Sequence, residues 1–240
     1  MIIISLGTVD RGSRNGTVPK RSSDKSYYLI INVRAMKDYT LYIFDFDMTL
    51  FDSMKGVKIC YRKAFQAVGF PFDERKCQVY VRESIDQTFE RFSNAPCKRR
   101  EFVAAFIRES EMSMLHNTEI FPETDRVIKA LMLKGKRLCI ASGKTEERIK
   151  SILKNHGLCG AFEHVIGYER IQEPKPSPYC LNYIISKYDI PKDSICYVGD
   201  ARNDMLAAQN AGIDGIYIPR GNPEDAPCAF RIETLNDLLE

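Results

Sequence analysis

The sequence lacks both a long apolar run and an excess of charge of one sign. A membrane-spanning helix needs about 20 consecutive apolar residues, and no segment of the 240-residue chain approaches that length. The 35 basic and 32 acidic residues leave a net charge of +3, which argues against a surface specialised for nucleic acid or anionic lipid. The initial apolar patch MIIISLG has no basic region before it and matches a signal peptide poorly. We therefore expect a cytoplasmic protein without nucleic-acid or membrane partners.

The chain also lacks a Cys-x-x-Cys pair, although it has eight cysteines. Their spacings match no zinc pattern, and several lie in apolar stretches such as RLCIA and SICYVG. We interpret them as buried free thiols in a reducing compartment. The three histidines form no motif, so they indicate no function.

Sustained periodicity is missing from the first 38 residues. The segment DRGSRNGTVPKRSSDKS is rich in Ser, Gly, Arg and Lys, a composition typical of a flexible segment. Met36 stands just before the organised part of the chain, so residues 1–35 are candidates for a dispensable extension. We predict that residues 1–38 form a flexible N-terminal extension.

Short apolar runs follow that point and alternate with helical patterns. The first run, TLYIF, is typical of a strand buried on both faces. Similar runs follow at residues 137–141, 163–167, 194–199 and 214–219. Between them apolar residues recur at helical spacing, as at Ile149, Ile152 and Leu153. This alternation predicts an α/β fold in which helices cover both faces of a parallel sheet.

The region 54–120 interrupts this alternation. It contains helical patterns but no convincing buried strand, and Pro71 and Pro96 divide it. The sequence FPETD then leads back to the alternating pattern. We predict an inserted helical domain over residues 54–120 and a core built from residues 39–53 and 121–240.

Two aspartates stand at the end of the first apolar run, where burying a charge is costly. Asp45 and Asp47 occur in LYIFDFDMTL, just past the predicted strand. In a parallel α/β sheet, ligands bind beyond the carboxyl ends of the strands. Two carboxylates this close repel each other unless a cation or a shared proton lies between them. Mg²⁺ would remove that repulsion, because it prefers carboxylate oxygens.

Polar side chains also follow the other predicted strands. Ser142 follows RLCIA, and Lys175 stands between two prolines after EHVIG. Asp200 follows SICYVG, and Asp204 comes four residues later. Carboxylates, a hydroxyl and a lysine at one sheet edge suit phosphoryl transfer, in which a carboxylate is the nucleophile and cations neutralise the phosphoryl oxygens. Taken singly, each residue has a structural alternative, such as a helix cap for Ser142 or a surface position for Lys175.

The four segments FDFDMTLFDS, IASGK, EPKPSP and VGDARND resemble the signature motifs of the haloacid dehalogenase superfamily of phosphohydrolases. They occur in the order and at the spacing of that family, and the resemblance covers roughly residues 40–220. It implies a Rossmann-like three-layer core. The inserted helical region is similar to the small α-helical cap domain of the phosphoglycolate phosphatase-like members.

The resemblance assigns roles to the aspartates. Asp45 corresponds to the nucleophile and a Mg²⁺ ligand. Asp47 corresponds to the general acid and base, and gives the metal its backbone carbonyl. Asp200 corresponds to a direct Mg²⁺ ligand, and Asp204 to a residue that holds the metal through water or orients its neighbours. The aspartate at position 47 also favours phosphate esters or anhydrides, because dehalogenases of the superfamily have none there.

Three further residues correspond to groups that contact the phosphoryl oxygens: Thr49, Ser142 and Lys175. The chain departs from the family at Met48, where glycine is usual. Glycine is favoured where φ is positive, so Met48 leads us to expect a backbone conformation that an ordinary residue adopts.

The resemblance implies Mg²⁺-dependent hydrolysis of a small phosphomonoester, a phosphorylated metabolite, through an aspartyl-phosphate, by a monomer or homodimer. A sugar-phosphate mutase or phosphonate hydrolase of the superfamily, and a non-catalytic phosphate- or Mg²⁺-binding module, are alternatives. A phosphonate hydrolase needs a Schiff-base lysine, for which the candidates are Lys55, Lys58 and Lys63. The candidates for contact with a substrate carboxylate or second phosphate are Arg82, Arg91 and Lys144.

Overall fold

The computed structural model describes residues 36–92, 95–222 and 224–240. Within it, Asp38–Glu240 form one compact unit. The flexible extension predicted over residues 1–38 lies almost entirely outside the described residues, so it stays a prediction.

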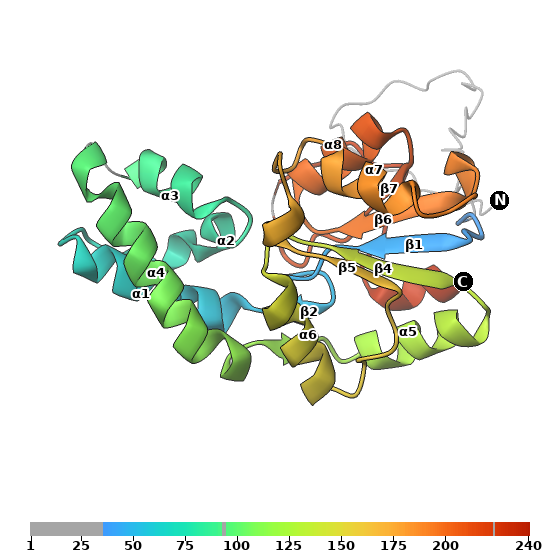
Figure 1. The fold of residues 1–240 in the computed structure, drawn as a ribbon, viewed down its shortest axis with the longest axis horizontal. Helices are drawn as coiled ribbons and strands as arrows, with labels where there is room; N and C mark the ends of the chain where they lie inside the picture. Colours follow the sequence, from blue (N-terminus) through green and yellow to red (C-terminus); the bar gives the residue numbers. More distant parts are fainter. Residues whose placement is uncertain (1–35, 93–94, 223) are drawn as a thin grey trace, which may run out of the picture. The chain divides into compact units, whose positions relative to one another are not determined.

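The described part of this unit contains a six-stranded parallel sheet (Figure 1). Its strands are ordered β5-β4-β1-β6-β7-β8, and each neighbouring pair is parallel. Their bounds are β1 Leu41–Phe44, β4 Arg137–Ala141, β5 His164–Ile166, β6 Ile195–Gly199, β7 Asp214–Tyr217 and β8 Phe230–Arg231. The first five in chain order fall in the apolar runs named above, so the predicted parallel α/β fold is confirmed. The two-residue edge strand β8 was not predicted.

Helices cover both faces of the sheet (Figure 1). The helices α7 Tyr179–Ile185 and α8 Arg202–Ala211 lie on one face, and α5 Thr124–Leu133 and α6 Glu146–Asn155 lie on the other. Side chains alternate along β1. Leu41 and Ile43 belong to a buried cluster with residues of α7 and α8, whereas Phe44 meets the ring of Phe162 edge-on. All of β1 is buried, as expected for a central strand of a doubly covered sheet.

A helical segment lies between two short strands that the sequence did not reveal. The strands β2 Phe51–Asp52 and β3 Glu119–Ile120 pair antiparallel. The described residues between them form α1 Met54–Ala67, α2 Cys77–Tyr80, α3 Ile85–Phe92 and α4 Arg99–Ser113. These helices share an apolar cluster of their own, in which the ring of Phe65 contacts those of Tyr61 and Phe102. We refer to residues 54–116 as the helical segment.

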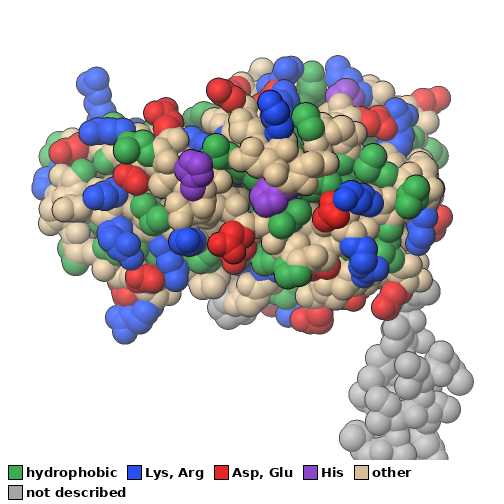
Figure 2. Space-filling model, turned by 90° about the horizontal axis from the view of Figure 1, so that it is seen from below, with side chains coloured by type: hydrophobic (Ala, Val, Ile, Leu, Met, Phe, Trp, Pro, Cys, Tyr) green, Lys and Arg blue, Asp and Glu red, His purple; other side chains and the backbone are tan. Residues whose placement is uncertain are grey.

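Short 3₁₀ helices complete the described secondary structure. They are η1 Glu74–Lys76, η2 Pro96–Lys98, η3 Met114–His116, η4 Tyr168–Arg170, η5 Lys192–Ser194 and η6 Leu235–Leu239. Among all the described helices, none has both the length and the apolar character needed to cross a membrane. The face in Figure 2 carries acidic and basic side chains interspersed with hydrophobic and neutral ones, as the balanced composition predicts.

The loop after β1 carries a residue in the left-handed backbone region. Met48 has a φ of 58°, its N–H donates to the carbonyl oxygen of Phe51 at 2.7 Å, and its side chain is buried. The expectation that Met48 adopts an ordinary conformation is therefore wrong. The tight return of the chain from Asp47 towards β2 requires positive φ, and packing of the Met48 side chain offsets the strain.

We predict that replacing Met48 with glycine is less harmful than replacing it with alanine. Both changes remove the same buried side chain, but only glycine adopts φ 58° without a Cβ clash. The free energy of unfolding of Met48→Gly should exceed that of Met48→Ala by about 1 kcal/mol. Urea denaturation of the two variants measures the difference, and a more stable alanine variant would contradict the strain argument.

Gly199 ends β6 where the next helix passes very close to the strand. A Cβ at Gly199 would lie 2.5 Å from Cβ of Asp204 and 2.6 Å from its Oδ2. Real Cβ atoms do not approach other atoms so closely, so any larger residue would displace the first turn of α8. Gly199 therefore fixes the position of the Asp204 carboxylate.

The change Gly199→Ala should lower the free energy of unfolding by about 1–3 kcal/mol, the usual cost of overpacking. The control is Gly143→Ala, because Gly143 is exposed and a Cβ there would meet nothing within 4 Å. That change should alter stability by less than about 0.5 kcal/mol. If thermal or urea unfolding showed equal losses of stability for the two variants, close packing would not be what requires glycine at position 199.

Candidate active site

Three buried aspartates meet at the carboxyl edge of the sheet. Asp45 follows β1, Asp200 follows β6, and Asp204 lies on the first turn of α8. The strands β1 and β6 are neighbours, and the N–H of Asp45 donates to the carbonyl oxygen of Val198 at 2.8 Å. One carboxylate oxygen from each aspartate lies within 4.8 Å of the other two. The topology thus brings together residues that are far apart in the sequence.

Lys175 reaches into this group from the loop after β5. Its Nζ donates to Oδ1 of Asp204 at 2.6 Å and to Oδ1 of Asp45 at 2.9 Å. It also donates to the hydroxyl of Tyr197 at 2.9 Å. A surface position, the structural alternative for Lys175, is therefore excluded.

Tyr197 is a member of the site that the sequence did not reveal. Its hydroxyl accepts from Lys175 and donates to the carbonyl oxygen of Ala141 at 2.9 Å, at the end of β4. It also lies 3.2 Å from Oδ1 of Asp204. In the sequence Tyr197 stands inside an apolar strand and looks like an ordinary core residue. Only the neighbourhood of β4, β6 and Lys175 gives its hydroxyl a role.

Asp45, Asp200 and Asp204 are called the acidic group below, and burial is the largest influence on the pKa values of Asp45 and Asp200. It raises the pKa of Asp45 to about 6, although the charge of Lys175 opposes this shift. Burial also raises the pKa of Asp200 well above its usual range, although Arg82 nearby has the opposite effect. The pKa of Lys175 stays well above its ordinary value, because the carboxylates of Asp204 and Asp45 outweigh the effect of burial. Lys175 and Arg82 therefore compensate the charged forms of Asp45 and Asp200 only in part.

The geometry and chemistry of the three aspartates fit a divalent cation. Mg²⁺ binds oxygen ligands at about 2.1 Å, so ligand oxygens on opposite sides of it are about 4.2 Å apart. The upper separation of 4.8 Å among the three carboxylates is close to this value. A cation there would supply the charge compensation that burial demands. Asp45, Asp200 and Asp204 are thus the residues that could hold it by their carboxylates.

Asp47 lies next to this group but has a different partner. Its Oδ1 forms an ion pair with Nζ of Lys144 at 3.1 Å, and 22% of its side chain is exposed. Asp47 is therefore the most accessible of the four aspartates, with Asp45, Asp200 and Asp204 buried.

Two predicted phosphate-contacting hydroxyls, Thr49 and Ser142, are buried on loops at the same edge. Within the described residues, Oγ1 of Thr49 has no hydrogen-bond partner. Among the same residues, the one hydrogen bond of Oγ of Ser142 is a long one of 3.4 Å, accepted from the N–H of Lys144. Ser142 is not the cap of α6, because the side chain of Glu169 accepts from the N–H of Glu146 at 2.9 Å. Both hydroxyls thus retain capacity to bond a ligand.

The three cationic residues predicted as candidates for contact with a substrate carboxylate or second phosphate each pair with a different acidic residue. Nε of Arg82 lies 2.7 Å from Oδ2 of Asp200. Lys144 pairs with Asp47. Arg91 pairs with Glu83 inside the helical segment, with Nε 3.2 Å from Oε2. Arg82 and Lys144 therefore reach the site, whereas Arg91 is engaged elsewhere.

The lysines considered for a Schiff base lie in α1 without the burial that such chemistry needs. Lys55 and Lys63 are exposed, and Lys58 pairs with Glu74 at 3.2 Å. A Schiff-base lysine has to lose its proton at neutral pH, which desolvation promotes. The phosphonate-hydrolase alternative therefore gains no support from these residues.

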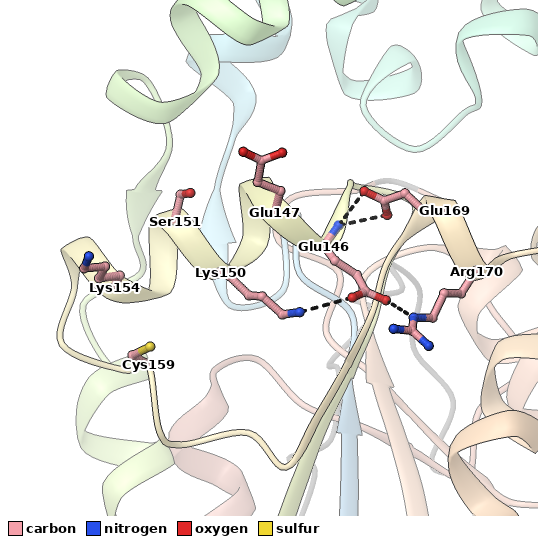
Figure 3. Close-up of a pocket in the computed structure, with 8 residues that line it drawn as sticks. All are labelled: Glu146, Glu147, Lys150, Ser151, Lys154, Cys159, Glu169 and Arg170. Carbon is pink, nitrogen blue, oxygen red and sulfur yellow. Dashed lines mark hydrogen bonds and ion pairs between the residues drawn. The ribbon is translucent and has the colours of Figure 1, made fainter.

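A separate hollow lies along α6 (Figure 3). It has a volume of about 550 Å³, and several of its charged side chains are engaged in hydrogen bonds or ion pairs. Glu146 accepts from Lys150 at 3.1 Å and from Arg170 at 2.5 Å, and Glu169 accepts from the first turn of α6. None of the aspartates of the acidic group lines it. Its ion pairs stabilise the start of α6, and they carry no catalytic assignment.

Comparison with known proteins agrees with this geometry. The model of the family described as haloacid dehalogenase-like hydrolase matches residues 42–218. A phosphoglycolate phosphatase from Vibrio parahaemolyticus is 28% identical over 222 residues, which cover 85% of this chain and 96% of that protein. A phosphoglycolate phosphatase from Aquifex aeolicus is 28% identical over 174 residues, covering 71% of this chain and 80% of the relative.

Solved structures share the fold as well. A haloacid dehalogenase-like hydrolase from Bacteroides fragilis superposes with a TM-score of 0.78 at 28% identity, covering 83% of this chain and 99% of that one. The matched residues 42–218 include the whole acidic group and Lys175. The predicted resemblance is confirmed, and the chain belongs to the haloacid dehalogenase-like hydrolases.

Proposed function

We propose that the protein is a Mg²⁺-dependent phosphatase that hydrolyses a small phosphomonoester through an aspartyl-phosphate on Asp45. The observation that supports this most directly is the environment of Asp45. Its carboxylate is held by Lys175 at 2.9 Å and lies within 4.8 Å of Asp200 and Asp204. A nucleophile fixed beside a cation site and a lysine is what in-line attack on a phosphate ester requires.

In the first step, a carboxylate oxygen of Asp45 attacks phosphorus, and the bond from phosphorus to the ester oxygen breaks. Asp47 donates a proton to the departing oxygen, so that a neutral alcohol leaves. Asp47 suits this role because its side chain is partly exposed and lies two residues from the nucleophile. Lys175 neutralises charge on the transferring oxygens while it keeps Asp45 in place.

In the second step, Asp47 takes a proton from water, and the water oxygen attacks phosphorus. The bond from phosphorus to Asp45 breaks, which releases inorganic phosphate and restores the carboxylate. Ser142 and Thr49 have hydroxyl groups free to donate to the phosphoryl oxygens. Asp45, Asp200 and Asp204 would hold Mg²⁺, which would supply positive charge against the negative charge that develops on those oxygens.

We further propose that residues 54–120 act as a cap over a core made of residues 39–53 and 121–240. Arg82 of the helical segment reaches Asp200 of the acidic group, as a covering element must. A cap excludes bulk water and selects the leaving group.

The phosphoglycolate phosphatases among its relatives support a small phosphorylated acid as substrate. The eight free cysteines, five of them buried, support a reducing compartment such as the cytoplasm.

Replacing Asp45 with asparagine should lower phosphate release from 2-phosphoglycolate by about 10³-fold or more, because the nucleophile is lost. The matched control is Asp125→Asn, which removes only an exposed pair with Lys129 and should leave the rate within about twofold. Chelation of Mg²⁺ should abolish the activity of the unmodified protein. Assays of inorganic phosphate across a panel of esters measure these rates.

Retention of activity by Asp45→Asn would exclude Asp45 as the nucleophile. Phosphate transfer to a second sugar hydroxyl without release of inorganic phosphate would favour the mutase. Failure of every ester with the folded protein would favour a binding module.

A further inference from the structure

Arg82 places a buried guanidinium against one of the aspartates proposed to hold the cation. It lies between α2 and α3, and only 6% of its side chain is exposed. Its Nε is 2.7 Å from Oδ2 of Asp200. A side chain from the helical segment thus supplies the positive charge that Asp200 requires in the core.

Arg82 is anchored mainly through its other nitrogens. Its Nη1 donates to the backbone oxygen of Gln78 at 2.7 Å and to Oε1 of the same residue at 2.8 Å. Its Nη2 donates to the carbonyl oxygen of Pro219 in the core at 3.3 Å. Arg82 therefore links the helical segment to the core at Pro219 as well as at Asp200.

The contact between Arg82 and Asp200 is electrostatic without being a well-formed hydrogen bond. Neither Nε of Arg82 nor Oδ2 of Asp200 has a hydrogen-bond partner among the described residues, although the two atoms are in ion-pair contact. Arginine and carboxylate usually form two parallel hydrogen bonds, which are stronger and more directional. Because the contact lacks this geometry, another cation can more readily replace the guanidinium beside Asp200.

We propose that Arg82 and the divalent cation are mutually exclusive partners of Asp200. Without the cation, the guanidinium compensates the buried carboxylate and fastens the helical segment to the core. The cation takes over Oδ2 of Asp200 and repels the guanidinium, since two positive centres then face the same oxygen. The segment is released at this point, and Arg82 becomes available to the anionic substrate. The inference rests on the proposed function for the cation site.

The first test measures Mg²⁺ affinity by calorimetry in the absence of substrate. Arg82→Gln removes the competing charge and should bind Mg²⁺ roughly tenfold more tightly than the unmodified protein. Arg82→Lys keeps the charge and should stay close to the unmodified protein. The matched control Arg91→Gln, in the same segment, should leave the affinity unchanged because Arg91 pairs with Glu83.

An affinity of Arg82→Gln equal to or weaker than that of the unmodified protein would overturn the proposal. An equal increase in the Mg²⁺ affinity of Arg82→Lys would also overturn it, because the shape of the side chain and not its charge would then control the affinity. The variant Asp200→Asn distinguishes a failure of the competition between Arg82 and the cation from a failure of the proposed cation site. If Asp200→Asn binds Mg²⁺ as the unmodified protein does, the cation site itself is wrong, whatever Arg82 does.

The second test follows the helical segment by amide hydrogen exchange. Mg²⁺ should speed exchange in peptides spanning residues 77–92 of the unmodified protein, because it removes the fastening at Asp200. Arg82→Gln should show the fast exchange already without Mg²⁺ and change little on its addition. Exchange that slows with Mg²⁺, or that is identical in both proteins without it, would contradict release of the segment.

Discussion

Lys175 puts a positive charge beside Asp45, a carboxyl group whose pKa burial raises. Its ammonium bonds Asp45 and Asp204 at once, and the hydroxyl of Tyr197 holds it in place. Burial raises the pKa of Asp45 only to about 6 because this charge opposes it. A carboxylate has to be ionised to attack phosphorus. The lysine therefore makes a buried nucleophile compatible with neutral pH, and the rest of the site is arranged around it.

The parallel sheet is what allows one lysine to reach these partners. β4, β1 and β6 are adjacent, so their carboxyl ends deliver Ala141, Asp45 and Asp200 to one edge. The helix after β6 starts so close to the strand that only glycine fits at position 199. That approach sets Asp204 against Lys175, at 2.6 Å. The site is thus a consequence of strand order and of one close contact between strand and helix.

These relations explain which parts of the structure could be predicted from the sequence. Buried strands have a local signature, so the runs around β1 and β6 were found, and with them the strand-end aspartates. The two-residue strands β2 and β3 have no such signature, since pairing with each other defines them. The φ of Met48 was mispredicted because the closure of a tight loop overrode the preference of its side chain. The partners of Tyr197 and Arg82 depend on tertiary contacts that no spacing in the sequence encodes.

The charges at the site also show why the helical segment and the core depend on each other. Asp45, Asp47, Asp200 and Asp204 face three cationic groups, Lys144, Lys175 and Arg82. Only Arg82 comes from the helical segment. A divalent cation in place of Arg82 brings one more positive charge to the site, which favours the approach of an anionic ester. The guanidinium of Arg82 can then balance the negative charge of the substrate. The same residue thus acts both without the cation, as the partner of Asp200, and with it, as a partner of the substrate.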